Sequence, residues 1–427
     1  MLRERERAQR RVLTILILGQ LLAGAGLAAG VTVGALLAED LLGGPGLSGL
    51  PSALFTGGSA LAAILVGKLS QARGRRPGLA LGFAFGALGA VGIVVATAVE
   101  SLPLLFAAFV VYGSGTATNL QARYAGADLA SPASRARSLS YVLLGTTAGA
   151  VAGPNLVGPT GVVAESMGLT PLAGPFLLAA AAYAGAALVI SLLLRPDPLL
   201  EARRWEAEDT DAEAASSSTP SSPGDATGPA APTRVWNADV ITGVVVMALT
   251  QFVMVGLMTM TPVHMRAHDH TVTVVGLVIS LHIAAMFLPA PLSGLLVDKF
   301  GTRRVAVSAG LVLLAAGVVA AVAPAQSTVL VTLALILLGL GWSLGLVAGT
   351  TVLTTSVPTS VRATVQGQAD VAVALAGAAG GLLSGLVFAW IDFRGLGFTL
   401  AALSLIVVAA VQPRGVSRPE GAPAAAR

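Results

Sequence analysis

The stretch Leu65–Leu79, LVGKLSQARGRRPGL, places three glycines and four basic residues between two long apolar runs. A similar stretch, SGLLVDKFGTRRVAV, begins at Ser293. At one constant offset along the chain, the first stretch matches the second at Gly67/Gly294, Leu69/Leu296, Gly74/Gly301, Arg75/Thr302 and Arg76/Arg303. The same loop motif therefore occurs twice in the chain.

Other features recur at nearly the same offset. Arg137 in SRARSLS matches Arg362 in SVRATVQG, and Gly149 matches Gly377. Together these matches indicate an internal repeat, and parallel repeats of six membrane spans are an established transporter architecture.

The composition is that of a membrane protein. Of 427 residues, 55% are hydrophobic and only 11% are charged, whereas a soluble domain has about 25% charged residues. The chain has no cysteine, which excludes disulfides and thiolate metal sites.

Apolar runs long enough to cross a bilayer divide the chain into six spans, a polar break and six more spans. We expect them near residues 12–38, 49–69, 78–98, 103–122, 139–160, 171–194, 238–262, 272–296, 304–323, 328–350, 364–389 and 396–412. The first run is too long for a signal peptide, whose apolar region has about 7–15 residues. The prediction is an all-α integral membrane protein with two six-helix bundles, 1–195 and 237–413, a linker, 196–236, and a tail, 414–427.

The basic residues predict the orientation. With the N-terminus inside, every lysine and arginine except Arg266 and Arg394 falls on the inner side of the predicted spans. This distribution follows the positive-inside rule, so we expect both termini in the cytoplasm of a cell carrying the protein in its plasma membrane. It also accounts for the net charge of +4 without a nucleic-acid partner.

The linker contains EAEDTDAEAASSSTPSSPGDATGPAAP. Acidic, serine and proline residues in this proportion cannot form a packed core, so we expect a disordered cytoplasmic segment. A regulatory or partner-binding role is the alternative.

The two loops resemble the signature of the major facilitator superfamily, Gly-x-Leu-x-Asp-Arg/Lys-x-Gly-Arg-Arg/Lys. The second loop keeps almost all of it, in Gly294, Leu296, Asp298, Lys299, Gly301 and Arg303, whereas in the first loop Gln71 replaces the acid. The resemblance implies a transporter with twelve spans that works by alternating access. A Gly-Lys-Ser/Thr ending, which a phosphate-binding loop needs, is missing from both loops.

The residue types in the loops suggest a latch. A carboxylate at the N-terminus of a neighbouring helix is favoured by the helix dipole, and breaking that contact would let the two halves rock apart. Gln71 supplies no charge, so we expect the first latch to be weaker. The alternative is that the arginines only fix the topology.

The fifth span, GTTAGAVAGPNLVGP, resembles the antiporter motif Gly-x-x-x-Gly-Pro-x-x-Gly-Gly of the same family. Gly149, Gly153, Pro154 and Gly158 match it, and Val157 replaces one glycine. This resemblance implies efflux. Small residues four apart also serve plain helix packing, which remains the alternative. The arginine and glutamine of the family's drug-antiporter motif in span four are replaced by Phe109 and Tyr112.

Few ionisable residues fall inside the spans, where they are costly and usually functional. Asp370 and His282 are the candidates for proton coupling, with a structural partner for the arginines and a packing histidine as the respective alternatives. Arg123 and Asp128 are close enough in sequence to pair with one another. The candidate partners of the latches are Arg123, Asp128, Arg137, Arg362 and Gln366.

The substrate is less well defined by the sequence. We expect Gln251, Met254 and Met258 in the substrate cavity, because methionine suits promiscuous apolar surfaces, although it also serves simple packing. His264, His268 and His270 are weak candidates for metal ligands. We expect no cofactor, a monomer, and a small-molecule substrate carried with protons.

Two classes of function remain open. The first is a secondary transporter, either a proton-coupled exporter of hydrophobic compounds or a carrier of a specific metabolite or metal ion. The second is a non-transporting membrane receptor or enzyme. No catalytic constellation falls at membrane depth in the sequence, and the repeated loop favours alternating access, so we expect a transporter and no enzyme.

Overall fold

The computed structural model describes residues 2–42, 50–216 and 235–411, and throughout these ranges the regular structure is helical. The helices are α1 (Leu2–Leu42), α2 (Leu50–Arg73), α3 (Arg75–Ala98), α4 (Leu102–Asp128), α5 (Arg135–Asn155), α6 (Val157–Ser166), α7 (Gly174–Leu193), α8 (Pro198–Ser216), α9 (Ala238–Ala267), α10 (Val272–Phe287), α11 (Ala290–Phe300), α12 (Thr302–Val322), α13 (Thr328–Ser356) and α14 (Arg362–Ala410). Short 3-10 turns lie at Pro132–Ser134 and Pro171–Ala173.

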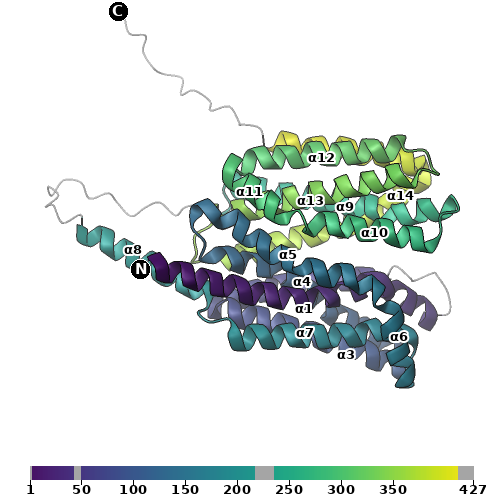
Figure 1. Ribbon diagram of the computed structural model, residues 1–427, viewed down its shortest axis with the longest axis horizontal. Coiled ribbons are helices and arrows are strands. Elements are labelled where there is room, and N and C mark those ends of the chain that lie inside the picture. Colours follow the sequence, from purple (N-terminus) through teal and green to yellow (C-terminus); the bar gives the residue numbers. More distant parts are fainter. Residues whose placement is uncertain (1, 43–49, 217–234, 412–427) are drawn as a thin grey trace, which may run out of the picture.

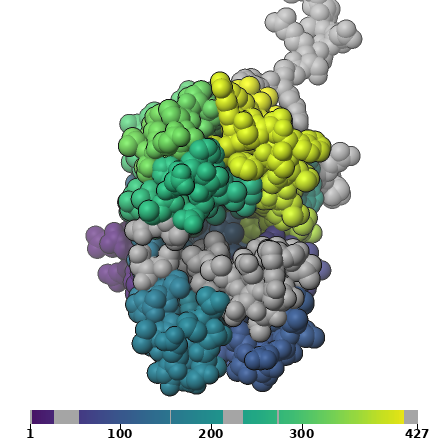
Figure 2. All heavy atoms as spheres, turned by 90° about the vertical axis from the view of Figure 1, so that its right-hand side faces the viewer, coloured from purple at the N-terminus to yellow at the C-terminus, as the bar shows by residue number. Residues whose placement is uncertain are grey.

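The helices form two bundles, α1 to α7 and α9 to α14, that lie one above the other with their axes roughly parallel (Figure 1). The N-terminus and α8 lie at the left end of this view, which we call the α8 end. Viewed from the opposite end, the two halves again form separate layers (Figure 2). Each half has its own apolar core, and the core of the second half extends into α4 and α5 through Tyr124, Ala136 and Leu139.

The twelve predicted spans all have helical counterparts in the described residues, but some of their boundaries differ. The fifth is broken at Leu156 into α5 and α6, and the eighth is broken next to Pro289 into α10 and α11. Both breaks fall in segments that contain prolines, which remove a helical hydrogen bond. Spans eleven and twelve run together as α14, and the kink between them lies at Ile391 and Asp392.

The predicted linker differs from the structure. The disorder expected for 196–236 is wrong for Pro198–Ser216, which form α8. Leu199, Ala202 and Trp205 recur every three residues, so α8 has an apolar face. Leu199 is buried, and Ala202 and Trp205 belong to the apolar cluster of the first half. This short periodic segment was missed in the sequence because the surrounding stretch is rich in acidic, serine and proline residues. Residues 217–234 of the predicted linker and the tail 412–427 lie outside the described residues.

The outer surface suits a lipid environment. Large apolar side chains such as Leu88, Leu382 and Trp390 are exposed around the bundle. Seven segments of the described chain are long and apolar enough to cross a membrane by length and composition alone. The chain is therefore a multi-pass membrane protein whose polar contacts gather between and within its two halves.

Candidate functional site

Both copies of the repeated loop turn at a glycine with positive φ. Gly74 joins α2 to α3 with φ 100°, and Gly301 joins α11 to α12 with φ 84°. Side-chain-bearing residues rarely adopt this backbone conformation. The glycine shared by the two loops therefore allows each pair of helices to meet without a longer connection.

The first glycine of each loop lies where the two halves touch. A Cβ atom at Gly67 on α2 would lie 2.8 Å from the carbonyl oxygen of Ala363 on α14. A Cβ atom at Gly294 on α11 would lie 2.7 Å from the carbonyl oxygen of Ala136 on α5. The backbones of opposite halves therefore approach at two points related by the repeat.

Asp298 of the second loop lies at the N-terminus of α5, in the opposite half. Its carboxylate accepts hydrogen bonds from the backbone N–H groups of Ala136 (3.0 Å) and Arg137 (3.2 Å). The Arg137 guanidinium adds an ion pair at 3.0 Å. The carboxylate thus satisfies free N–H groups of a helix terminus and lies at the positive end of the helix dipole.

Gln71 of the first loop occupies the corresponding place at the N-terminus of α14. Its Oε1 accepts a hydrogen bond from the Ala363 N–H (2.8 Å), and its Nε2 donates to the carbonyl oxygens of Thr359 (3.0 Å) and Ser360 (2.5 Å). The amide therefore replaces one ion pair with donor contacts that a carboxylate cannot make. This contact carries no charge, unlike that of Asp298.

A buried cluster of charged groups joins the halves behind the first loop. Arg75 of α3 pairs with Asp128 of α4 at 2.8 Å, and both side chains are almost fully buried. The Arg75 guanidinium also donates to Oε1 of Gln366 on α14. Arg362 lies 4.0 Å from Asp128. Arg76, by contrast, bonds to Asp197 through its backbone N–H.

A second buried pair lies deeper along α4. Arg123 donates to Asp370 of α14 at 2.7 Å and to Thr350 of α13 at 3.0 Å, so one arginine of the first half contacts two helices of the second. The Tyr124 hydroxyl donates to the same Asp370 oxygen at 3.1 Å. The other oxygen, Oδ2, is buried and has no hydrogen-bond partner among the described residues. The expected Arg123–Asp128 pair is therefore wrong, because the two residues find separate partners.

The helix α8 is attached to the first half. The Asp197 carboxylate, just before α8, accepts hydrogen bonds from the N–H groups of Arg75 (3.0 Å) and Arg76 (2.7 Å) at the start of α3. Further along, Asp209 forms an ion pair with Arg5 of α1 at 2.7 Å. These contacts attach the start and the middle of α8 to the same bundle.

From this position α8 also reaches the second half. Glu206 accepts a hydrogen bond from the Thr359 hydroxyl (2.5 Å) and lies 3.9 Å from Arg362. Arg203 donates to the carbonyl oxygens of Gln71 (2.9 Å) and Thr359 (3.4 Å). The predicted linker therefore contributes side chains to the contact between the halves.

His282 lies apart from the other histidines, of which His264 and His268 are in ring contact, with centroids 4.5 Å apart. His282 is fully buried in α10, and its Nδ1 donates to the Leu335 carbonyl of α13 (2.8 Å), within the second half. His264 stacks on Phe393 with ring centroids 4.1 Å apart. His268 and His270 bond instead to backbone and hydroxyl groups, and the described residues contain no group of three side chains that could hold a metal ion.

The glycines of α5 pack against α1. A Cβ atom at Gly145 would lie 2.9 Å from the Ile17 carbonyl oxygen, and Gly149 is in backbone contact with Gly24. Gly153 is buried, whereas Gly158 of α6 has open space around it. Pro154 lies near the end of α5, just before the break at Leu156. The packing interpretation thus accounts for the first glycines of the motif, and efflux remains a prediction.

The three residues expected in the substrate cavity lie on α9. Met254 is buried in the apolar core of the second half, Met258 packs against that core, and Gln251 is partly buried. Gln251 Oε1 accepts a hydrogen bond from the indole N–H of Trp342 (2.7 Å). Met254 therefore serves core packing in this conformation.

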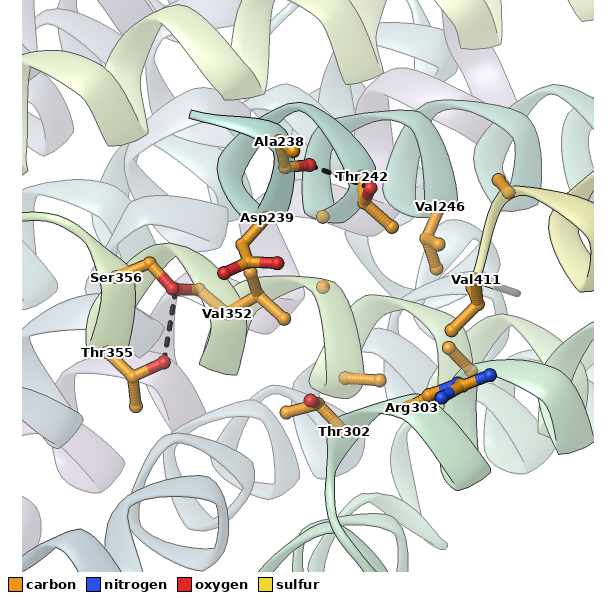
Figure 3. Close-up of a pocket in the computed structure, with 15 residues that line it drawn as sticks. Ala238, Asp239, Thr242, Val246, Thr302, Arg303, Val352, Thr355, Ser356 and Val411 are labelled. Atoms are coloured by element: carbon orange, nitrogen blue, oxygen red, sulfur yellow. Dashed lines mark hydrogen bonds between the residues drawn. The ribbon is translucent and has the colours of Figure 1, made fainter. Parts of the chain in front are cut away.

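Two residues at the end of the second loop, Thr302 and Arg303, line a separate pocket. A cavity of about 440 Å³ opens between α9, α12, α13 and the end of α14, where the Asp239 carboxylate points inward and Arg303 lies on the wall (Figure 3). Lys299 lies 5.3 Å above the ring of its neighbour Phe300. Neither Arg303 nor Lys299 forms an ion pair with the described residues of the first half.

The geometry agrees with comparisons to known proteins. A family model described as Major Facilitator Superfamily matches residues 16–270 and 240–426, which together span nearly the whole chain. The chain belongs to the major facilitator superfamily. It is a secondary transporter, not an enzyme, and its family carries small-molecule substrates across membranes.

Relatives within the superfamily cover most of the chain. The uncharacterized MFS-type transporter YdeG of Bacillus subtilis (strain 168) is 50% identical over 403 residues, 94% of this chain and 91% of that protein. The riboflavin transporter RfnT of Brucella anthropi is 30% identical over 348 residues, 80% of this chain and 79% of that protein. Among solved structures, the human organic anion transporter MFSD10 (TETRAN) is similar with a TM-score of 0.73 and 19% identity, covering 95% of this chain and 99% of that one.

Several residues of the site were not found by sequence reasoning. Tyr124 and Thr350 carry no charge, and Asp197 and Glu206 lie in the segment predicted to be disordered, 196–236. The internal repeat could have pointed to Thr350. It follows Arg123 by the same number of residues by which the second loop follows the first. The two residues that bond across the interface are thus equivalent positions of the two halves.

The contact at Asp298 leads to a measurable prediction. Asp298→Asn removes the charge that attracts Arg137 and the α5 terminus, and we expect the closed α8 end to lose about 1–2 kcal/mol, a reduced value because Arg137 is 41% exposed. Because the chain has no cysteine, nitroxide labels can be placed at Ala72 and Arg304 alone, which are exposed on opposite halves. Double electron–electron resonance should then show a larger population of molecules in which the two labels are farther apart.

The matched control is Glu208→Gln, which breaks the exposed Arg204–Glu208 pair within α8. This variant should leave the distance distribution unchanged, since exposed pairs within one helix are worth little. An Asp298→Asn distribution equal to that of the control would show that the carboxylate does not hold the halves together.

Proposed function

We propose that this transporter exports amphipathic small molecules in exchange for protons, with Asp370 as the proton-binding group. The observation that carries the proposal is the Arg123–Asp370 pair, which joins the two halves while one carboxylate oxygen remains buried without a partner among the described residues. A buried ion pair is weakened strongly when one partner loses its charge. Protonation of Asp370 would therefore release α14 from α4.

The contacts at the α8 end support the same cycle. The conformation described is held closed there by Asp298, Gln71 and the Arg75 cluster, all of which connect opposite halves. We propose that the α8 end faces the cytoplasm of a plasma-membrane protein, as the distribution of basic residues predicts. Opening of this end would admit the substrate, and the resemblance of α5 to the antiporter motif supports export.

His282 is a weaker candidate for the proton site. Its hydrogen bond joins α10 to α13 within one half. Asp370 acts directly on a contact between the halves.

A second candidate function is a carrier for one metabolite. It is favoured by the 30% identity to a riboflavin transporter over 80% of the chain and by the burial of Met254 in the core, which leaves less of the methionine surface expected for promiscuous binding. A flavin-like compound is the substrate that this relationship suggests.

The test uses purified protein in liposomes with an imposed pH gradient. The substrate panel contains riboflavin, a lipophilic cationic dye and a neutral lipophilic drug. We expect at least one compound to accumulate inside the liposomes when the pH gradient drives protons out of them. This accumulation should disappear when an ionophore removes the gradient. Transport that ignores the gradient would contradict proton coupling, and selective transport of riboflavin would favour the second candidate.

A further inference from the structure

The crossing of α1 with α5 is repeated by the crossing of α9 with α14. The backbone of Leu21 contacts Gly149, and the backbone of Phe252 contacts Gly380 in the same way. Phe252 follows Leu21 at the same spacing at which Gly380 follows Gly149, so in the structure Gly380 takes the place of Gly149, whereas the sequence match pairs Gly149 with Gly377. At this spacing Gln20 of α1 is equivalent to Gln251 of α9, so each half carries a glutamine at the same place.

The glutamine of the first half belongs to a buried group of polar side chains. Gln20 is fully buried, and its Nε2 donates to the Asn119 carbonyl oxygen of α4 (2.9 Å) and to the Thr146 hydroxyl of α5 (3.1 Å). Its Oε1 has no partner among the described residues, and neither do Oδ1 and Nδ2 of the buried Asn119 side chain. Two carboxamides therefore present unpaired acceptors and an unpaired donor inside the described part of one bundle.

The glutamine of the second half is also placed by its neighbours. Gln251 Oε1 accepts the indole N–H of Trp342 on α13 at 2.7 Å, and a Cβ atom at Gly377 of α14 would lie 3.2 Å from Gln251 Nε2. In both halves the glutamine thus bonds to the fourth span and packs against a glycine of the fifth span. The arrangement is a feature of the repeat.

Unpaired amide atoms are costly at membrane depth, where no bulk water replaces the missing partner. The fold itself does not require them, because the position equivalent to Asn119 in the second half, at the offset of the two loops, is Leu346. Asn119 also precedes Arg123 by one helical turn, so the two residues lie on the same side of α4, and Arg123 is the residue that pairs with Asp370. This position connects them with the proposed transport cycle.

We infer that Gln20, Asn119 and Gln251 form the hydrogen-bonding part of the substrate site, and that this site takes an uncharged ligand with adjacent donor and acceptor groups, such as a ring imide or a carboxamide. The inference rests on the proposed transport function and specifies its substrate class. The three side chains offer hydrogen-bond donors and acceptors without a formal charge. They therefore suit a ligand whose hydrogen-bonding groups are also uncharged. The amides of the first half are enclosed in this conformation, where Gln20 of α1 bonds to α4 and α5, so the ligand reaches them only when these helices move.

The test compares two probes that differ at one hydrogen-bonding atom. Riboflavin carries an imide N–H between two carbonyl groups, and 3-methylriboflavin lacks that N–H. Binding to the full-length protein in lipid nanodiscs is followed by flavin fluorescence. We expect 3-methylriboflavin to bind about 10-fold more weakly or worse, because a site with polar partners rejects an analogue that leaves them unpaired.

The variants are Asn119→Leu, which installs the residue of the other half, and Gln251→Leu. Each should weaken riboflavin binding and bring the ratio of the two dissociation constants toward one. The control is Gln326→Leu, an exposed glutamine between α12 and α13, which should change neither constant. Thermal unfolding identifies any variant that fails to fold, and Gln251→Leu carries the test if Asn119→Leu does not fold.

Equal binding of the two flavins, an unchanged ratio in the folded variants, or no flavin binding at all would overturn the inference. Tighter binding of tetraphenylphosphonium, a cation without hydrogen-bonding groups, would also overturn it. None of these outcomes decides the proposed proton coupling, because that coupling can also be measured without any ligand, through the distance between labels at Ala72 and Arg304 at different pH values.

Discussion

Asp370→Asn is expected to abolish gradient-driven transport while leaving exchange of substrate across the membrane in place. Asparagine keeps the shape of the side chain and an acceptor for Arg123, but it neither carries a charge nor takes up a proton. The loss of one charge from a buried pair costs roughly 3–5 kcal/mol, and the 2.7 Å contact with Arg123 lies between the halves. The variant should therefore favour the open α8 end at every pH.

In the wild type, ionised Asp370 stabilises the closed α8 end, so this stabilisation falls as the pH is lowered and the carboxylate takes up a proton. The population of the long Ala72–Arg304 distance should rise as the pH falls in the wild type and stay constant in Asp370→Asn. Asp298→Asn is the matched control, since it removes another inter-half carboxylate but should keep the pH response. A pH response that survives Asp370→Asn would assign the proton to another group.

Gly67→Val should prevent the α8 end from closing. The added side chain would meet the Ala363 carbonyl oxygen at 2.8 Å and the Gly367 Cα at 3.0 Å, both in the backbone of α14. Backbone atoms cannot move aside as a flexible side chain can, so α2 and α14 must separate. Overpacking of this kind costs about 1–3 kcal/mol, and the longer label distance should become the main population.

Gly385→Val makes the same chemical change at a glycine of α14 that has open space around it. It should leave the label distance and the thermal stability close to those of the wild type, and Gly67→Ala should give an intermediate distance population. If Gly67→Val and Gly385→Val gave the same distance distribution, the close approach at Gly67 would not limit closure.

Much of the architecture could be predicted from the sequence because apolar length and basic charge act locally. The spans follow from apolar runs, and the turns at Gly74 and Gly301 follow from the repeated loop. The place of Asp298 at a neighbouring helix terminus also follows from its charge and from the motif. These features depend on a few adjacent residues, which is the range over which sequence patterns are informative.

The pairing between the halves could not be predicted in the same way. Arg123 and Asp128 lie close together in one helix, yet their partners, Asp370 and Arg75, come from other helices. The choice depends on how the bundles meet, and the spacing within α4 contains no information about it. The helix α8 was missed because its acidic, alanine-rich composition continues into a serine- and proline-rich stretch, which masked its short apolar face.

The attachment of α8 also determines how the chain can be divided. A break before Asp197 would deprive the start of α3 of its capping carboxylate and would separate Asp209 from Arg5. Two co-expressed fragments should therefore reassemble when the first ends beyond Ser216 and the second begins before Asn237, which caps α9 through the Val240 N–H. The last span of the first half ends before α8, but the boundary at which the chain can be divided lies after α8. A protein fused between the two halves should therefore be inserted after this helix.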